Sequence, residues 1–128
     1  MYQISSDELL FFDGHSGAIP IYGSFAETLF ERFPATSIRV QKTQITFSSR
    51  HVYACVSFAR VKKKAELPLP YLVITLGLPF PLDSQRVPVR TEPYPGRWTN
   101  HVLISDPSDL DGEFWEWVSQ AYEFSEMK

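Results

Sequence analysis

Apolar residues recur every three or four positions in two segments of the chain, a spacing that predicts two amphipathic helices. In residues 16–33 the apolar positions are Ala18, Tyr22, Phe25, Leu29 and Phe33. Pro20 fits the first turn of this helix, because amides there lack intrahelical acceptors, and Pro34 ends the helix. In the C-terminal segment the apolar positions are Leu110, Phe114, Trp117, Val118 and Ala121.

Capping patterns predict where helices begin. Ser5-Ser6-Asp7-Glu8 is a capping box, in which the Ser5 hydroxyl accepts from the Glu8 amide and the Glu8 side chain reaches back. A short helix should therefore start the chain and end near Gly14. Ser105-Asp106-Pro107 combines a helix-capping residue with a proline at the first helical position, so the C-terminal helix should begin there.

Between these helices the period shortens to two, which is typical of β-strands. Ile38 and Val40 alternate with polar residues, and then the phase slips by one so that Ile45 and Phe47 carry the apolar face. The slip places a bulge or break around Lys42-Thr43. Residues 51–58 alternate again with Val52, Ala54, Val56 and Phe58 on one face, and the turn at residues 48–50 predicts a hairpin.

Two further strands are expected. Residues 71–78 are almost continuously apolar, which favours a central strand covered on both faces, and residues 97–105 form the last strand. The segments 60–70 and 79–96 connect these strands, and the second is long enough to suggest a functional or partly ordered loop. We therefore predict one α+β domain over residues 1–128, with N-terminal helices, a mostly antiparallel sheet of four to five strands and a C-terminal helix packed on the sheet.

Composition supports a folded domain. Of the 128 residues, 44% are hydrophobic and 21% charged, which excludes disordered and fibrous classes, and aromatic residues at 15% predict a core filled with large rings. The single cysteine, Cys55, cannot form an internal disulfide. The first residues lack the pattern of a signal peptide, and no apolar run approaches the ~20 residues that a membrane helix needs, so we expect a cytoplasmic protein without a membrane partner.

Charge is divided between the helical and the strand segments. Residues 1–35 and 106–128 hold twelve acidic and two basic residues, a net charge of −10. Residues 36–105 hold ten basic and three acidic residues, a net charge of +7. The overall charge of −3 is therefore a cancellation, and it does not argue against anionic partners of the strand region.

Five short strings lie along the chain: residues 12–15 (FDGH), 42–47 (KTQITF), 71–78 (YLVITLGL), 82–87 (LDSQRV) and 95–102 (PGRWTNHV). Together they resemble an uncharacterised bacterial family of domains of unknown function (DUF5655-like). The similarity runs along nearly the whole chain and implies a compact α+β domain without an established activity. The family pattern has two adjacent histidines after a Trp-Thr pair, whereas the first position here is Asn100, which argues against a role that needs both imidazoles.

One group of polar residues is a candidate ligand site. Arg97, Thr99 and His101 share one face of the last strand by alternation. If the phase slip turns Lys42 toward that face, a cationic cluster forms that suits a phosphate or carboxylate of a small molecule or protein partner. The alternative is that Arg86 and Arg97 pair with Asp83 and Glu92 to hold the long loop. The predicted ligand-binding residues are Lys42, Gln44, Arg86, Arg97 and His101, with His15 either lining a pocket or capping a carbonyl group.

Catalytic and metal sites have weaker support. No nucleophile elbow, P-loop or dinucleotide fingerprint occurs, so an enzyme would have to use His101 with Asp83, and Ser84 could complete a triad with them. The three histidines lack the short spacing of metal ligands, and we expect no metal and no cofactor. Alternation places Cys55 on the face opposite Ala54, together with Tyr53 and Ser57.

A second function remains open, the binding of single-stranded nucleic acid. Arg60 and Lys62-Lys63-Lys64 form a basic run whose simplest interpretation is a solvated connection. In a nucleic-acid interface, cations would follow the phosphates and aromatic rings would stack on bases. The further residues of that interface would be Arg39, Arg50, Tyr53, Tyr94 and Trp98.

Overall fold

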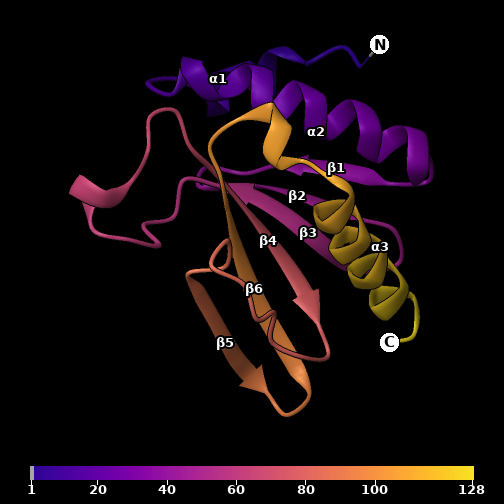
Figure 1. The fold of residues 1–128 in the computed structure, drawn as a ribbon. Coiled ribbons are helices and arrows are strands. Elements are labelled where there is room, and N and C mark those ends of the chain that lie inside the picture. Colours follow the sequence, from indigo (N-terminus) through magenta and orange to yellow (C-terminus); the bar gives the residue numbers. More distant parts are fainter. Residues whose placement is uncertain (1) are drawn as a thin grey trace.

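The computed structural model describes residues 2–128, and it consists of one six-stranded sheet with its two longer helices on one face (Figure 1). No helix in this part of the chain is long and apolar enough to cross a membrane. The helices are α1 (Ser6–Phe11), α2 (Ile19–Arg32) and α3 (Gly112–Glu126). The strands are β1 (Ser37–Val40), β2 (Gln44–Ser48), β3 (Val52–Ser57), β4 (Leu72–Leu78), β5 (Val89–Tyr94) and β6 (Arg97–Ile104).

All neighbouring strands are antiparallel, in the order β1-β2-β3-β4-β6-β5. The predicted fold class is confirmed, with six strands instead of four to five. One additional strand arises because the phase slip at Lys42-Thr43 is a turn between two separate strands, β1 and β2. The other, β5, lies in the segment expected to be a loop. The apolar strand β4 is central, as predicted, and pairs with β3 and β6.

The helices form where the apolar spacing predicts them. In α2 the buried side chains include Tyr22, Phe25 and Leu29, and the helix ends at Phe33, directly before Pro34. The start of the C-terminal helix differs from the prediction. Asp106 caps only a short 3₁₀ helix, Pro107–Asp109, and α3 begins after Asp111, whose side chain accepts from the Phe114 amide. Because Asp106 and Asp111 each cap a helix, the segment forms a short 3₁₀ helix followed by α3.

A β-bulge changes which side chains of β3 face the core. Phe47 pairs with Ala54 and Ser48 pairs with Val52, so Tyr53 is an extra residue between two pairs. Tyr53 and Ala54 are therefore both buried, and the Tyr53 hydroxyl lies 2.7 Å from the Thr36 hydroxyl. The prediction that Tyr53 shares a face with Cys55 is wrong, because strict alternation does not continue through a bulge.

The segment 79–88 is held against the sheet by Asn100, whose side chain is completely buried. Its Oδ1 accepts a hydrogen bond from the Leu82 amide at 2.8 Å, and its Nδ2 donates to the Phe80 carbonyl at 3.3 Å. Leu82 and Val87 of this segment are buried. The long connection is therefore an anchored segment followed by an edge strand, which corrects the expectation of a partly ordered loop over residues 79–96.

Replacing Asn100 with alanine should lower the free energy of unfolding by about 2 kcal/mol, because the buried Leu82 amide loses its acceptor. Urea denaturation measures this loss, and hydrogen exchange should show faster exchange at the Leu82 amide. Gln85→Ala, an exposed change in the same segment, is the control and should cost less than about 0.5 kcal/mol. Equal stability of the two variants would show that the Asn100 hydrogen bonds do not anchor the segment.

Candidate functional site

The face of the sheet opposite α2 and α3 carries a row of polar side chains. The strand registers place Thr46 opposite Cys55, Cys55 opposite Thr75, and Thr75 opposite His101. Because directly opposed residues on antiparallel strands point to the same face, these four side chains form a line across β2, β3, β4 and β6. The core residues Ile45, Val56, Ile74 and Val102 alternate with them and point toward the helices.

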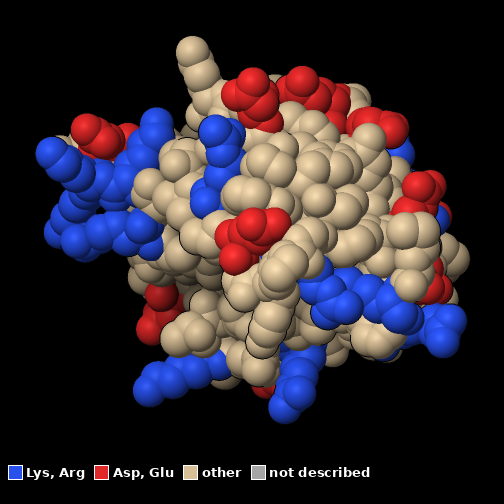
Figure 2. Space-filling model, turned by 90° about the horizontal axis from the view of Figure 1, so that it is seen from below, with Lys and Arg blue, Asp and Glu red and all other residues tan. Residues whose placement is uncertain are grey.

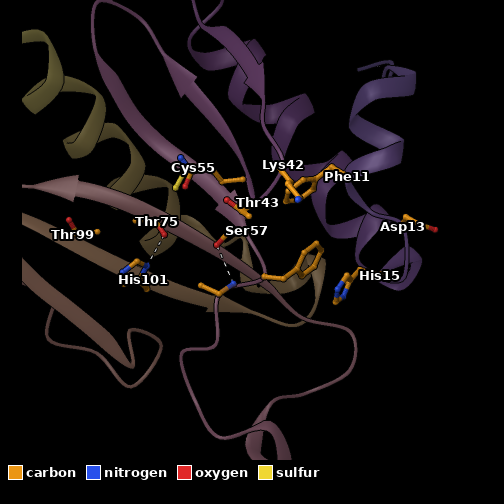
Figure 3. Close-up of a pocket in the computed structure, with 13 residues that line it drawn as sticks. Phe11, Asp13, His15, Lys42, Thr43, Cys55, Ser57, Thr75, Thr99 and His101 are labelled. Atoms are coloured by element: carbon orange, nitrogen blue, oxygen red, sulfur yellow. Dashed lines mark hydrogen bonds between the residues drawn. The ribbon is translucent and has the colours of Figure 1, made fainter.

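A cavity of about 710 Å³ lies on this face, between the sheet and the end of α1 (Figure 3). In the close-up, His101 and Thr99 lie toward one end of the group of lining residues, and Asp13 and His15 lie toward the other. The volume is within the range of ordinary small-molecule sites, about 300–1,000 Å³. The lining residues are Phe11, Asp13, His15, Lys42, Thr43, Gln44, Cys55, Ser57, Phe58, Ala59, Thr75, Thr99 and His101.

Aromatic rings form the wall of the cavity nearest α1. The Phe58 ring stacks on both Phe11 and His15, with ring centroids 5.6 Å from Phe11 and 3.8 Å from His15. Tyr71 meets the edge of this stack and donates a hydrogen bond to the Phe58 carbonyl at 3.0 Å. The wall joins the end of α1, the end of β3 and the start of β4, so it forms only when these three segments pack together.

The opposite end of the cavity is polar and uncharged at neutral pH. His101 Nδ1 lies 2.8 Å from the Thr75 hydroxyl in a hydrogen bond, and burial lowers the pKa of His101 below its usual 6.5. Burial also raises the pKa of the Cys55 thiol, although hydrogen bonding from Thr75 opposes part of this shift. His101 is therefore a neutral imidazole and Cys55 a neutral thiol, which is unsuited to the role of a reactive thiolate.

Lys42 supplies the cationic group of the cavity. It is exposed in the turn between β1 and β2, and its ammonium group has no ion-pair partner among residues 2–128. Asp13 is the only acidic residue of the lining, and Figure 3 shows its side chain pointing away from the other labelled residues. Among the lining residues, Lys42 is therefore the lysine or arginine that an anion in the cavity would meet.

The structure brings together four of the six predicted ligand-binding residues. Lys42, Gln44, His15 and His101 all line the cavity, and the Gln44 amide also donates to the Gln41 side chain at 3.3 Å. His15 stacks on Phe58, so its ring forms part of a cavity wall. The shared-face argument for Lys42 and His101 thus matches the geometry, although the cluster contains one cation and not several.

Arg86 does not join this group, and its expected place beside Lys42 and His101 is wrong. Its guanidinium lies 3.0 Å from Asp111 and 3.2 Å from Glu113, at the start of α3, and it also donates to the Asp109 carbonyl. It stacks above the Trp117 ring at 5.3 Å. The arginine therefore holds the segment 79–88 to α3, a structural role like the predicted alternative but with different acidic partners.

Arg97 and Asp83 also lie away from the cavity. Arg97 is four residues from His101 along β6, a separation of about 13 Å for a strand, and its side chain is exposed. Asp83 belongs to the segment that Asn100 holds against the opposite face of β6, so it does not meet His101. Ser84 accepts from the Arg86 amide at 3.1 Å. The predicted enzyme pair of His101 and Asp83 is therefore not formed, and no triad follows.

The remaining histidine and the acidic residues form no metal centre. His51 is exposed at the hairpin turn, and its Nδ1 lies 3.1 Å from the Ser125 carbonyl near the end of α3. Within residues 2–128, no group of three or more His, Cys, Asp or Glu side chains is placed to hold a metal ion.

Sequence reasoning missed the aromatic wall. Alternation predicts Phe58 on the core face of its strand, and it does pack against the core, with its ring edge-on to Phe12; because it follows the end of β3, it also lines the cavity, which alternation did not indicate. Phe11 lies at the end of a short helix, where no periodic pattern identifies its face. The sequence did indicate the polar face of the sheet at Cys55, because this residue is out of phase with the apolar positions of its strand.

The cavity lies within a segment that matches a known family. The model of the domain of unknown function DUF5655 matches residues 11–125, which is most of the chain. The chain belongs to the DUF5655 family. All residues that line the cavity fall inside the DUF5655 match, whereas the capping box of α1 precedes it. Comparison with curated proteins and with solved structures found no match.

Proposed function

We propose that this domain binds a small organic anion in the cavity on its open sheet face. The observation that carries the proposal is the Lys42 ammonium, a cation without an ion-pair partner in the described chain, in a cavity whose acidic lining residue, Asp13, points away from the other labelled residues (Figure 3). A phosphate or carboxylate would form a charge-assisted hydrogen bond with the Lys42 ammonium group. The acidic helices do not oppose this, because the segment that contains the sheet has a net charge of +7.

The other lining residues support a ligand with distinct ends. Phe11, Phe58 and His15 offer an apolar, planar surface near Lys42. Thr75 and the neutral His101 offer hydrogen-bond donors and acceptors to an uncharged polar group. An apolar, aromatic wall facing convergent polar groups is an arrangement that small-molecule sites use to fix the orientation of a ligand.

The broader nucleic-acid interface has less support. Tyr53, one of its expected stacking rings, is buried beneath the sheet and contacts Phe33 and Tyr122. Arg50 lies at the β2–β3 turn and Tyr94 at the end of β5, so the remaining residues belong to separate parts of the sheet. The cavity is therefore the more specific candidate.

The test is thermal stabilisation of the protein by a panel of phosphates, nucleotides and carboxylates, followed by titration of the best compound. Saturation at about one hundred times the dissociation constant should stabilise the fold by about 2.7 kcal/mol. Lys42→Ala should weaken binding about tenfold, equivalent to about 1.4 kcal/mol. Lys63→Ala, an exposed lysine outside the cavity, is the matched control and should leave the affinity unchanged.

Two results would overturn the proposal. One is the absence of stabilisation by every compound in the panel. The other is binding that Lys42→Ala and Lys63→Ala weaken to the same extent, because that would indicate general attraction to positive charge. His101→Gln, which keeps a neutral hydrogen-bonding group, should retain most of the affinity if His101 acts as an uncharged partner.

A further inference from the structure

A second cavity adjoins the first across the aromatic wall. It has a volume of about 310 Å³, and it shares His15 and Phe58 with the larger cavity. Its other lining residues are Arg60, Lys64, Leu67, Leu69 and Tyr71. The two cavities are therefore neighbouring compartments, with the same pair of stacked rings between them.

Each compartment has its own cationic group. Lys42 lines the larger cavity, whereas Arg60 and Lys64 line the smaller one. Arg60 and Lys64 are exposed, and in the described chain neither has an ion-pair partner. Figure 2 shows Lys and Arg side chains gathered at the left margin, where the connection between β3 and β4 projects in Figure 1. Because the two cavities share no lysine or arginine, a ligand that occupies both would meet a different cationic group in each.

His15, which lines both compartments, is the candidate stacking surface for a ligand. Phe58 is covered by Phe11 and by His15, which are both nearly parallel to it. His15 also meets Tyr71 edge-on at 6.4 Å between ring centroids, and its side chain is otherwise exposed, so the part of its ring that Phe58 and Tyr71 leave uncovered is accessible to a ligand. Nucleic-acid bases stack on aromatic side chains, including histidine, at single-stranded sites.

From these observations we propose that the ligand is a nucleotide unit with a phosphate on each side of its nucleoside. The proposal rests on the proposed function and specifies its ligand. The base stacks on His15, one phosphate contacts Lys42, and the other contacts Arg60 and Lys64. Arginine suits the second position, since its planar guanidinium binds phosphate oxygens in pairs. A free nucleoside 3′,5′-bisphosphate and a nucleotide within a short single strand both have this chemistry.

The test compares three probes by isothermal titration calorimetry at fixed ionic strength: adenosine 5′-monophosphate, adenosine 3′,5′-bisphosphate and a trinucleotide of adenosine. The native protein should bind the bisphosphate about tenfold more tightly than the monophosphate, because the second phosphate gains the Arg60 and Lys64 contacts. The double variant Arg60→Ala/Lys64→Ala should abolish this gain, so that it binds the bisphosphate and the monophosphate with equal affinity.

The chain offers a matched control for charge. Lys62→Ala/Lys63→Ala removes the same number of positive charges from the same segment, but neither residue lines a cavity. This variant should keep the tenfold gain. His15→Ala should weaken the bisphosphate about tenfold by removing the stacking surface, and His15→Phe should restore most of the affinity.

The outcomes separate this inference from the proposed function. If the monophosphate binds through Lys42 but the second phosphate gives no gain, the nucleotide inference is wrong and the proposed anion site stands. The inference is also wrong if Lys62→Ala/Lys63→Ala reduces the affinity for the bisphosphate as much as Arg60→Ala/Lys64→Ala does. If no anion binds at all, the proposed function fails. A trinucleotide that binds at least as tightly as the bisphosphate identifies a single strand as the ligand, and exclusion of the trinucleotide identifies the free bisphosphate.

Discussion

Replacing Phe25 with alanine should lower the free energy of unfolding by about 4 kcal/mol, within the range for deletion of a buried aromatic side chain. Phe25 is completely buried at the point where α2, β2 and α3 meet. Its ring stacks on Trp115 at 5.6 Å between centroids and meets the edges of Phe47 and Phe114. Large neighbouring rings cannot collapse fully into the space, so the variant should keep a cavity in the centre of the core.

Urea denaturation of Phe25→Ala measures this loss, with two comparison variants. Phe80→Ala makes the same chemical change at a side chain that is 41% exposed, and it should cost less than about 1.5 kcal/mol. Phe25→Leu keeps an apolar side chain and should be intermediate. A loss below about 2 kcal/mol for Phe25→Ala would contradict the central role of this ring.

Replacing Glu8 with alanine should cost about 3 kcal/mol at neutral pH, because hydrogen bonds to a buried charge are strong and their loss leaves unpaired groups. Glu8 is only 2% exposed. Its carboxylate accepts from the Tyr2 hydroxyl at 2.7 Å, from the Ser5 amide at 2.8 Å and from the buried Tyr22 hydroxyl. Removal of the side chain breaks the capping box of α1 and leaves the Tyr22 hydroxyl without its acceptor.

The contribution of Glu8 should depend on pH in a defined direction. Burial alone would raise the pKa of Glu8, but the hydrogen bonds from Tyr22, Ser5 and Tyr2 outweigh it, and the pKa is lowered below its ordinary value of 4.5. A lowered folded-state pKa means that ionisation stabilises the folded protein above pH 4.5. The stability difference between the native protein and Glu8→Gln should therefore be constant from about pH 6 to 8 and shrink as the pH falls below about 4.5.

Denaturation curves between pH 3 and pH 8 test both statements. Glu123→Ala, an exposed acidic residue on α3, is the control and should change stability by less than about 0.5 kcal/mol. A difference between the native protein and Glu8→Gln that grows as the pH falls would contradict the predicted sign. A cost for Glu8→Ala equal to that of Glu123→Ala would show that the buried hydrogen bonds are not stabilising.

The elements with repeating local patterns were predictable. The apolar spacing in α2 and α3 and the apolar run of β4 each describe a surface that must be buried, and local spacing determines which residues share it. The errors occur where no pattern repeats. The strand β5 consists largely of exposed residues and contains Pro93, so nothing in its composition marks it as a strand. It exists because β6 offers an unpaired edge.

The residues of the candidate site were predictable only where the local pattern of a single strand or turn indicates which face of the sheet a side chain lies on. Alternation placed His101 on a polar face, and the phase slip turned Lys42 toward it. Arg86 carries the same charge as Lys42, and no local pattern distinguishes a cation that binds a ligand from one that pairs with Asp111. That distinction depends on where α3 begins relative to a segment some twenty-five residues earlier.

The sequence by itself determined the fold class, the main helices and the central strand, together with the separation of acidic helices from a basic sheet region. These properties depend on neighbouring residues and on the need to bury apolar surface. Only the tertiary structure decided the strand order, the stacking of His15 on Phe58 and the row from Thr46 to His101. Contacts between distant segments depend on the register of several strands at once, and a local pattern does not specify that register.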